Sequence, residues 1–239
     1  MVGDIHGAHD ALCARLLGPD LRWDGGTAHL WLLGDLVDRG ADDLAVIELV
    51  MRLQHEAASS GGMVAALLGN HELHLLAARR FGERDAPELG CTFEEYWLRG
   101  GGQPASMLGL TIDQATWLAG LPALALDVMH ADAPFYGECG DTIPAVNAAF
   151  RAVIGSDDAE AWALLLRRFA GRLAFDPRIA GRWRTPQWFL DRFGTTSLVQ
   201  GPPIDSSWTS GPFIYWKGRC VALDGRLWAG EPGCLFRIA

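Results

Sequence analysis

The sequence predicts an α/β fold built around a parallel sheet. Two short apolar runs, residues 29–33 and 63–68, have the length and continuity of strands that are buried on both faces. Between them, residues 44–51 carry apolar side chains on one helical face. A strand, its crossover helix and the next parallel strand need about 30 residues or more. The spacing of the two runs therefore fits one such unit.

Three polar motifs follow apolar segments at nearly even intervals. They are GDIHG at residues 3–7, GDLVDRG at 34–40 and GNHE at 69–72. In open α/β sheets, ligands bind beyond the carboxyl ends of the strands, so we expect the motifs to meet at one edge. Their Asp, His and Asn side chains suit metal ions, and two cations about 3.5–4 Å apart activate water while neutralising a phosphate. The motifs therefore predict a two-metal phosphoesterase.

The same motifs match a family pattern, GDxHG, GDxxDRG and GNHE, without a substitution. On these residues the chain resembles the calcineurin-like metallophosphoesterases, specifically the Ser/Thr phosphatase-like branch of phosphoprotein phosphatases, which includes bacterial diadenosine tetraphosphatase relatives. The resemblance implies a four-layer αββα sandwich of two mixed sheets. It also implies that Asp4 and His6 hold the first metal ion, that Asp35 bridges both ions and that Asn70 binds the second.

The resemblance further implies which residues carry the reaction. His71 would protonate the leaving oxygen, Asp38 would orient His71, and Arg39 with Asn70 would bind the phosphate of a phosphate monoester. A hydroxide that bridges the metal ions would attack phosphorus in line. The residue types agree, because carboxylates bridge cations, imidazoles suit first-row metals and guanidiniums bind two phosphate oxygens. We expect two divalent ions, manganese first, with iron, zinc, nickel or cobalt as alternatives. The substrate stays open among a phosphoprotein, a nucleotide and a dinucleoside polyphosphate.

Residues 124–131 predict a further strand, which ends at His130. Because the family delivers a histidine to the second metal ion from such a strand, we expect His130 to be a metal ligand. Four other histidines lie in predicted helices or strands, and we expect them to be structural or solvated: His9, His29, His55 and His74.

One position of the family pattern is missing. The family places a last metal-binding histidine in a Gly-His turn after a late strand, where this chain has Gly201 and Pro202. No other alignment supplies it, because His130 is the last of seven histidines, and proline has no side-chain donor. Three outcomes stay open: Asp205 provides an oxygen ligand, water fills the position, or the chain is a non-catalytic pseudophosphatase that binds phosphate or phosphopeptides. Weakened catalysis is the outcome that we prefer.

The sequence near each end of the chain predicts strands of the two sheets. Only Met1 and Val2 precede the first motif, so we expect the first strand to be almost missing, and a misassigned start codon is our preferred explanation. Near the other end, strand-like runs at 213–216, 219–223 and 234–238 predict the second sheet of the sandwich.

We expect one domain over residues 1–239, with residues 79–122 as a helical insertion or cap. The glycine triplet at 100–102 is interpreted either as a flexible joint of this insertion or as a plain connecting loop. Arg182 or Arg184 is a candidate for a second phosphate-binding arginine. The spacing selects neither of them, and a solvated arginine is the alternative interpretation.

Composition limits the partners. A net charge of −9 disfavours a nucleic-acid polymer, whose backbone is bound by clustered Lys and Arg. The five scattered cysteines include no CxxC pair and predict reduced thiols in the cytoplasm. No export signal or apolar run of membrane-spanning length is present, so we expect a cytoplasmic enzyme without a membrane partner. The expected partner is the phosphorylated substrate, and the oligomeric state stays open.

Overall fold

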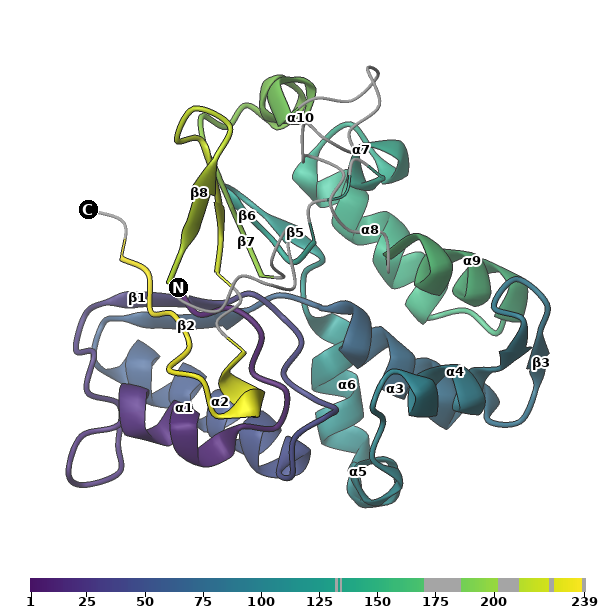
Figure 1. Ribbon diagram of the computed structural model, residues 1–239, viewed down its shortest axis with the longest axis horizontal. Coiled ribbons are helices and arrows are strands. Elements are labelled where there is room, and N and C mark those ends of the chain that lie inside the picture. The colour runs from purple at the N-terminus through teal and green to yellow at the C-terminus, as the bar shows by residue number, and fades with distance from the viewer. Residues whose placement is uncertain (132, 134, 170–185, 202–210, 224–225, 238–239) are drawn as a thin grey trace.

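A computed structural model of the 239-residue chain describes residues 1–131, 133, 135–169, 186–201, 211–223 and 226–237. The described residues form two main sheets, and helices lie on the outer side of each sheet (Figure 1). The predicted α/β class with mixed strand pairing is confirmed.

The first sheet contains the strands that precede the second and third motifs. Strand β1 (His29–Leu32) runs parallel to β2 (Met63–Ala66), with Leu32 opposite Ala66. Helix α2 (Asp43–Ser59) connects them, and α1 (His9–Leu16) packs beside α2 below the sheet (Figure 1). The expected first strand is reduced to one parallel bridge between Val2 and Leu32. The carboxyl ends of these segments thus face the same side.

The second sheet has the strand order β5-β6-β7-β9-β8. Its β6–β7 and β7–β9 pairs are parallel, and its outer pairs are antiparallel. The strand bounds are β5 (Leu124–Ala125), β6 (Val128–Met129), β7 (Leu198–Gln200), β8 (Phe213–Tyr215) and β9 (Cys220–Ala222).

Two predictions about this sheet were wrong in detail. Residues 124–131 form a hairpin instead of one strand, because the chain reverses at Asp127, whose φ is +63°. The run 234–238 was expected in the second sheet, but Leu235 pairs with Val2, and the Phe236 N–H donates to the Met1 carbonyl. The tail therefore supplies pairing for the short amino-terminal segment.

The segment expected to be an insertion lies beside the first sheet. It follows α3 (Asn70–Phe81) and contains β3 (Asp85–Ala86), β4 (Cys91–Thr92), α4 (Phe93–Arg99), α5 (Pro104–Gly109) and α6 (Ile112–Gly120). Thr92 and Thr111 accept the N–H of the residue three positions on, which fixes the starts of α4 and α6. The remaining helices are α7 (Tyr136–Cys139), α8 (Ile143–Ile154), α9 (Ala159–Phe169), α10 (Pro186–Phe193) and the 3₁₀ turn η1 (Leu227–Ala229).

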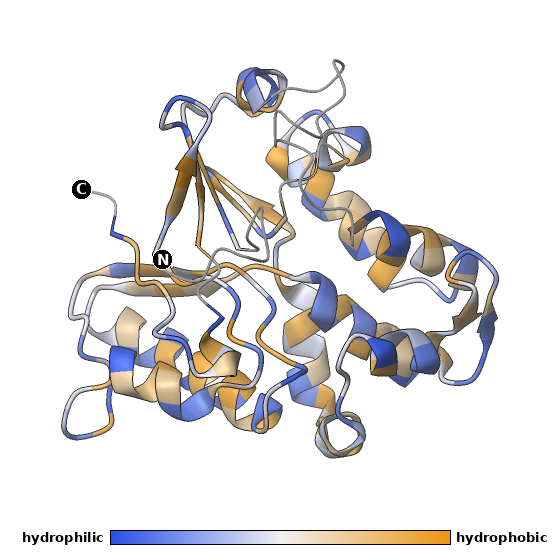
Figure 2. Ribbon diagram, in the orientation of Figure 1, coloured by the Kyte–Doolittle hydropathy of each residue, from blue (hydrophilic) through white to orange (hydrophobic). Residues whose placement is uncertain are grey.

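The two main sheets meet at a small apolar core. Leu33 and Leu67 follow β1 and β2, and they pack with Val128, Val199 and Val221 of the second sheet. A larger core fills the space beneath the helices, and Figure 2 shows its apolar residues in orange along the strands and on one side of the helices. Among the described helices, none combines the length and apolarity that crossing a bilayer requires.

Candidate metal centre

The predicted site residues come together at the carboxyl ends of the strands. Asp4 and His6 follow the Val2 bridge, Asp35 follows β1, Asn70 begins α3 after β2, and His130 follows β6. All five are buried. Three groups of potential metal-binding atoms form there, and the atoms of each group lie within 4.8 Å of one another. Asp35 belongs to two of them, one with His6 and His71 and one with Asp4 and His130. The third consists of Asp38, His71 and His74.

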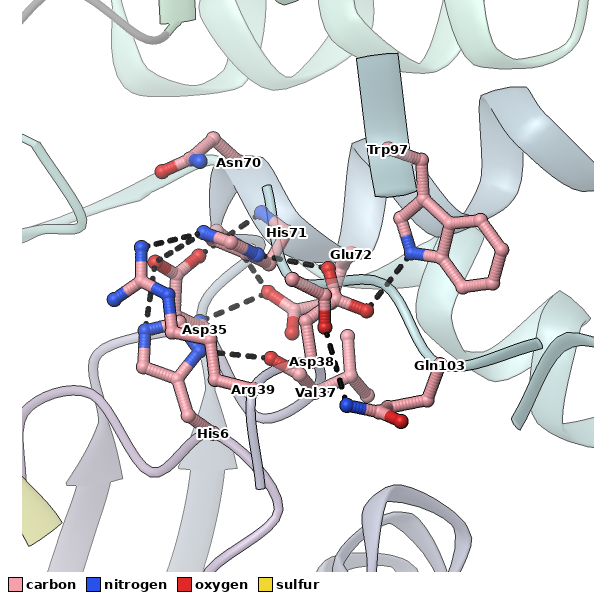
Figure 3. A network of polar contacts seen from close by, with 12 residues as sticks. His6, Asp35, Val37, Asp38, Arg39, Asn70, His71, Glu72, Trp97 and Gln103 are labelled. Atoms are coloured by element: carbon pink, nitrogen blue, oxygen red, sulfur yellow. Dashed lines mark hydrogen bonds and ion pairs between the residues drawn. The ribbon is translucent and has the colours of Figure 1, made fainter. Parts of the chain in front are cut away.

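His6 presents an available imidazole nitrogen to this cluster. Its Nδ1 donates to the Val37 carbonyl at 2.8 Å, which leaves a lone pair on Nε2 (Figure 3). Nε2 is buried, makes no hydrogen bond with any described residue, and lies 3.8 Å from Asp4 Oδ2 and 3.7 Å from Asp35 Oδ2. Burial lowers the pKa of His6 well below its usual value, so the ring is neutral. Ligand atoms bound at about 2.0–2.2 Å to one cation lie about 3–4 Å apart, so this arrangement fits a metal ion.

Asp35 directs its two carboxylate oxygens to different sides. Oδ2 faces His6, and Oδ1 lies 3.3 Å from Nε2 of His130. That nitrogen is also 3.0 Å from Asn70 Oδ1, while His130 Nδ1 donates to the Leu33 carbonyl at 2.8 Å. Two sets of oxygen and imidazole donors thus flank one carboxylate, and this donor chemistry suits a pair of first-row divalent ions.

Gly201 brings the end of β7 against the cluster. A Cβ atom at Gly201 would lie 2.6 Å from Asp4 Oδ1 and 3.3 Å from His130 Nδ1, so any larger residue there would displace the Asp4 carboxylate. The Gly201 N–H donates to the His130 carbonyl at 2.9 Å. Four of the residues discussed from the sequence lie outside the described residues: Arg182, Arg184, Pro202 and Asp205.

The residues expected to act on the substrate adjoin the cluster. His71 Nδ1 donates to Asp38 Oδ2 at 2.7 Å, and Arg39 Nη2 donates to His71 Nε2 at 3.1 Å (Figure 3). The guanidinium of Arg39 also stacks over the Trp228 ring at 5.4 Å, and Trp228 lies edge-on to His6. The imidazole and the guanidinium therefore face the same space beside the metal-binding atoms.

Glu72 is a structural residue of the site whose role the sequence reasoning missed. Its carboxylate accepts three backbone N–H groups, from Asp35 at 2.9 Å, Leu36 at 2.7 Å and Gly69 at 2.7 Å. Burial, with the nearby charge of Asp35, raises the pKa of Glu72. Through these hydrogen bonds the Glu72 carboxylate connects the second motif to the third. The sequence offered one signal for this role: Glu72 is a charged residue at the end of the third motif, whose other polar residues were predicted to bind metal or to act in catalysis.

Trp97 was also missed, because nothing in the pattern of the insertion distinguishes it from a core residue. Its indole Nε1 donates to Asp38 Oδ1 at 2.8 Å. Of the histidines expected to be structural or solvated, His9, His29 and His55 lie at the surface or half-buried. His74 is buried, with its ring 5.1 Å from that of His71.

Comparisons with known proteins agree with this geometry. A family model described as calcineurin-like phosphoesterase matches residues 1–146. The chain is 29% identical to a symmetrical bis(5'-nucleosyl)-tetraphosphatase of Shigella dysenteriae over 273 aligned residues, which cover 98% of this chain and 89% of the relative. A protein of the same description from Sodalis glossinidius is 41% identical over 88 residues, which cover 37% of this chain and only 28% of the relative.

Solved structures with a similar fold are also known. The cold-active protein-tyrosine phosphatase of a psychrophilic Shewanella species superposes with a TM-score of 0.68 at 21% identity, and the match covers 97% of this chain and 72% of that one. A second structure of a cold-active protein tyrosine phosphatase gives a TM-score of 0.69 at the same identity, with 97% and 70% covered. At this identity the likeness shows a shared fold.

Proposed function

The chain belongs to the calcineurin-like phosphoesterase family and is a hydrolase of phosphoester bonds, and from this premise we propose that it is a two-metal phosphatase centred on Asp35. The observation that carries the proposal is that Asp35 directs Oδ2 toward His6 Nε2, at 3.7 Å, and Oδ1 toward His130 Nε2, at 3.3 Å. Asp4, His6 and Asp35 would hold one ion, and Asp35, Asn70 and His130 would hold the other. Manganese is the first candidate, because oxygen donors outnumber imidazoles in this set.

Metal ions in such a site lower the pKa of water toward neutrality and neutralise phosphate charge. The residues of the chain would do the rest. Arg39 would bind two equatorial oxygens of the phosphate in the geometry that a planar guanidinium favours. Helix α3 begins at Asn70, so the positive end of its dipole would favour the same anion.

His71 would act in its doubly protonated form and would give the proton on Nε2 to the leaving oxygen. Asp38 holds Nδ1, which leaves Nε2 directed to the space shared with Arg39 and Asp35, at 3.1 Å and 3.9 Å. General acid catalysis of this kind typically contributes about 10²–10⁴-fold. A protein that only binds phosphate has no need of an oriented proton donor, so the buried His71–Asp38 pair supports catalysis over the pseudophosphatase alternative.

Dinucleoside polyphosphates are the substrate class that we propose first. The support is the similarity over nearly the whole chain to a relative described as a symmetrical bis(5'-nucleosyl)-tetraphosphatase. We also propose that residues 1–239 form one domain with residues 79–122 as an insertion. The packing of both main sheets against one small core, to which Leu33 and Val128 both belong, supports a single unit.

The test is manganese-dependent hydrolysis of p-nitrophenyl phosphate and of diadenosine tetraphosphate by the chain and by Asp35→Asn. The variant should lose bound metal and should lose activity by about a hundredfold or more, because several kcal/mol of charge stabilisation disappear with the metal ions. Metal content is measured by elemental analysis after gel filtration. Activity that survives unchanged in Asp35→Asn would sink the two-metal proposal.

A second arm of the same assay addresses the missing histidine. Gly201 lies against Asp4 and His130, and Pro202, the next residue in the sequence, stands where the family pattern has its last histidine. Pro202→His should lower the manganese concentration that gives half-maximal activity. A parent chain without activity, rescued by Pro202→His, would contradict catalysis and support the pseudophosphatase instead.

A further inference from the structure

The carboxylate of Asp38 is held from two sides. Its Oδ2 accepts the Nδ1–H of His71 at 2.7 Å, and its Oδ1 accepts the indole N–H of Trp97 at 2.8 Å (Figure 3). All three side chains are almost completely buried. Trp97 lies on α4, in the segment of residues 79–122, whereas Asp38 and His71 come from the second and third motifs. The insertion thus reaches the proton-donating pair directly.

The hydrogen bond from Trp97 to Oδ1 of Asp38 determines which oxygen of Asp38 accepts the His71 N–H. An indole nitrogen only donates, so Oδ1 must act as an acceptor, and the carboxylate cannot rotate without leaving a buried group unsatisfied. With Oδ1 committed, Oδ2 is the atom that remains for His71. His71 therefore keeps its Nδ1–H on Asp38, and Nε2, which carries the transferable proton when the ring is doubly protonated, faces the site.

Trp97 itself is held firmly. A Cβ atom at Gly102 would lie 2.3 Å from the indole ring, so Gly102 packs flat against it, and the Gly102 N–H donates to the Trp97 carbonyl at 3.1 Å. The start of α4 is fixed by the reciprocal bonds between Thr92 and Glu95. Trp97 is therefore a fixed donor for Asp38 and does not adapt to it.

The glycine turn next to Trp97 also contacts the phosphate-binding arginine. The Arg39 N–H donates to the Gly101 carbonyl at 2.8 Å. A Cβ atom at Gly101 would lie 2.8 Å from Arg39 Cγ. The same three-residue turn thus packs against Trp97 on one side and Arg39 on the other.

We infer that Trp97 is a positioning residue of the reaction, through which the insertion aligns the Asp38–His71 pair with the leaving group. The inference rests on the proposed function, because it assigns Trp97 a role in proton donation by His71. It places part of the catalytic machinery in a segment that carries none of the three motifs. Trp97 would act through Asp38, to which its indole N–H donates.

The test is Trp97→Phe, which keeps an aromatic ring of similar packing and removes the N–H donor. Turnover is measured on p-nitrophenyl phosphate, whose leaving group needs little protonation, and on an alkyl phosphate, whose leaving group needs much. The variant should lose about tenfold in kcat on the alkyl phosphate, a part of what a general acid contributes, and less than about twofold on p-nitrophenyl phosphate. KM should stay within about twofold for both substrates, because Arg39 is untouched.

The matched control is Trp117→Phe. Trp117 lies on α6 of the same insertion, and its indole N–H donates to Gln54 Oε1 at 3.0 Å, so this variant loses the same kind of hydrogen bond away from Asp38. It should change kcat on both substrates equally or not at all. An equal loss on both substrates in Trp97→Phe would show a general structural effect and would overturn the inference.

A double-mutant cycle with His71→Asn separates the inference from the function on which it rests. If Trp97 acts through His71, Trp97→Phe should cost nothing further in the His71→Asn background. A selective loss on alkyl phosphate in His71→Asn without one in Trp97→Phe would overturn the role of Trp97 alone. No selective loss in His71→Asn would overturn proton donation by His71, and the inference with it.

If Trp97→Phe does not fold, Asp38→Asn tests the same contact from its other side. The NMR signal of the Trp97 indole N–H should shift in this variant, while that of Trp117 stays as an internal reference. Alkyl phosphate turnover should again fall selectively. An unshifted Trp97 signal or an unselective loss would overturn the inference.

Discussion

Four residues of the site hold a backbone conformation that L-amino acids avoid. His6, Asp35, Asp38 and Arg39 have φ values between +47° and +70°. Such residues cost on the order of 1–3 kcal/mol each and persist where their surroundings over-determine them. Glu72 holds the Asp35 N–H, and Gly101 holds the Arg39 N–H. The backbone strain is thus concentrated in residues whose side chains must point in one fixed direction at the site.

Asp43 is a further buried carboxylate at the residue scale. It begins α2, accepts the Ser106 hydroxyl at 2.7 Å, and its Oδ1 lies 2.6 Å from where a Cβ of Gly7 would be. Burial is the main reason that its pKa rises to about 6 from 3.8. A carboxyl group whose folded pKa is raised favours the folded state below its unfolded pKa. That contribution is lost as the pH rises through the folded pKa.

Asp43→Asn should therefore remove a pH dependence of stability. The free energy of unfolding of the parent, relative to the variant, should fall by about 2.4 kcal/mol between pH 4 and pH 7. Urea unfolding at several pH values measures the difference. Asp42→Asn is the control, since it removes the same charge from an exposed neighbouring position. A parent-to-variant difference that stays constant over this range would contradict the raised pKa.

The motif residues could be placed from the sequence because the ends of parallel strands converge, which fixes where Asp4, Asp35 and Asn70 lie relative to one another. Trp97 could not be placed in this way. Its contact with Asp38 joins residues 59 positions apart through the path of the insertion, and no local pattern encodes that path. Glu72 was adjacent to known residues, but its role depends on backbone groups that only the folded loops bring together.

At the scale of the elements, the turn at residues 100–102 joins the segment of residues 79–122 to the site. Gly101 has a φ of +102°, a region that side chains rarely adopt, and no Cβ fits there beside Arg39 Cγ. The turn was interpreted from the sequence as a flexible joint or a plain loop. Its contacts with Arg39 and Trp97 give it a third role, as packing surface for both.

Gly101→Ala should impair phosphate binding. The added methyl group would push the Arg39 side chain and strain the turn, so we expect kcat/KM to fall by about tenfold, which corresponds to about 1.4 kcal/mol, with most of the change in KM. Gly120→Ala on α6 is the control, because no atom lies within 4 Å of its Cβ position. Steady-state kinetics on p-nitrophenyl phosphate distinguish the two variants. Equal kinetics in both would remove this role of the turn.

Element boundaries were predictable where one pattern dominated. Helix α2 and the strands β1 and β2 follow from apolar runs and helical spacing. The hairpin β5–β6 was read as one strand because its apolar residues are continuous across Asp127, and a single residue at φ +63° reverses the chain there. Side-chain hydropathy does not report such a reversal.

At the scale of the whole molecule, the candidate ligands connect the two main sheets. Asp4, Asp35 and Asn70 come from the first sheet and its loops, whereas His130 follows β6 of the second. The His130 ring already joins the sheets by donating to the Leu33 carbonyl at 2.8 Å. Metal binding would therefore add a link across the molecule, next to the small core around Leu33 and Val128.

This arrangement predicts that manganese stabilises the entire fold. At a metal concentration about 100 times Kd, one site adds about 2.7 kcal/mol, which corresponds to a rise of about 5–10 °C in Tm for a chain of this length. Differential scanning calorimetry with EDTA and with manganese measures the rise. Asp42→Asn should retain it, whereas Asp35→Asn should lose it, because both ions depend on Asp35. If Asp35→Asn showed the full rise, the metal would act elsewhere on the surface, and the cluster between the sheets would not be the binding site.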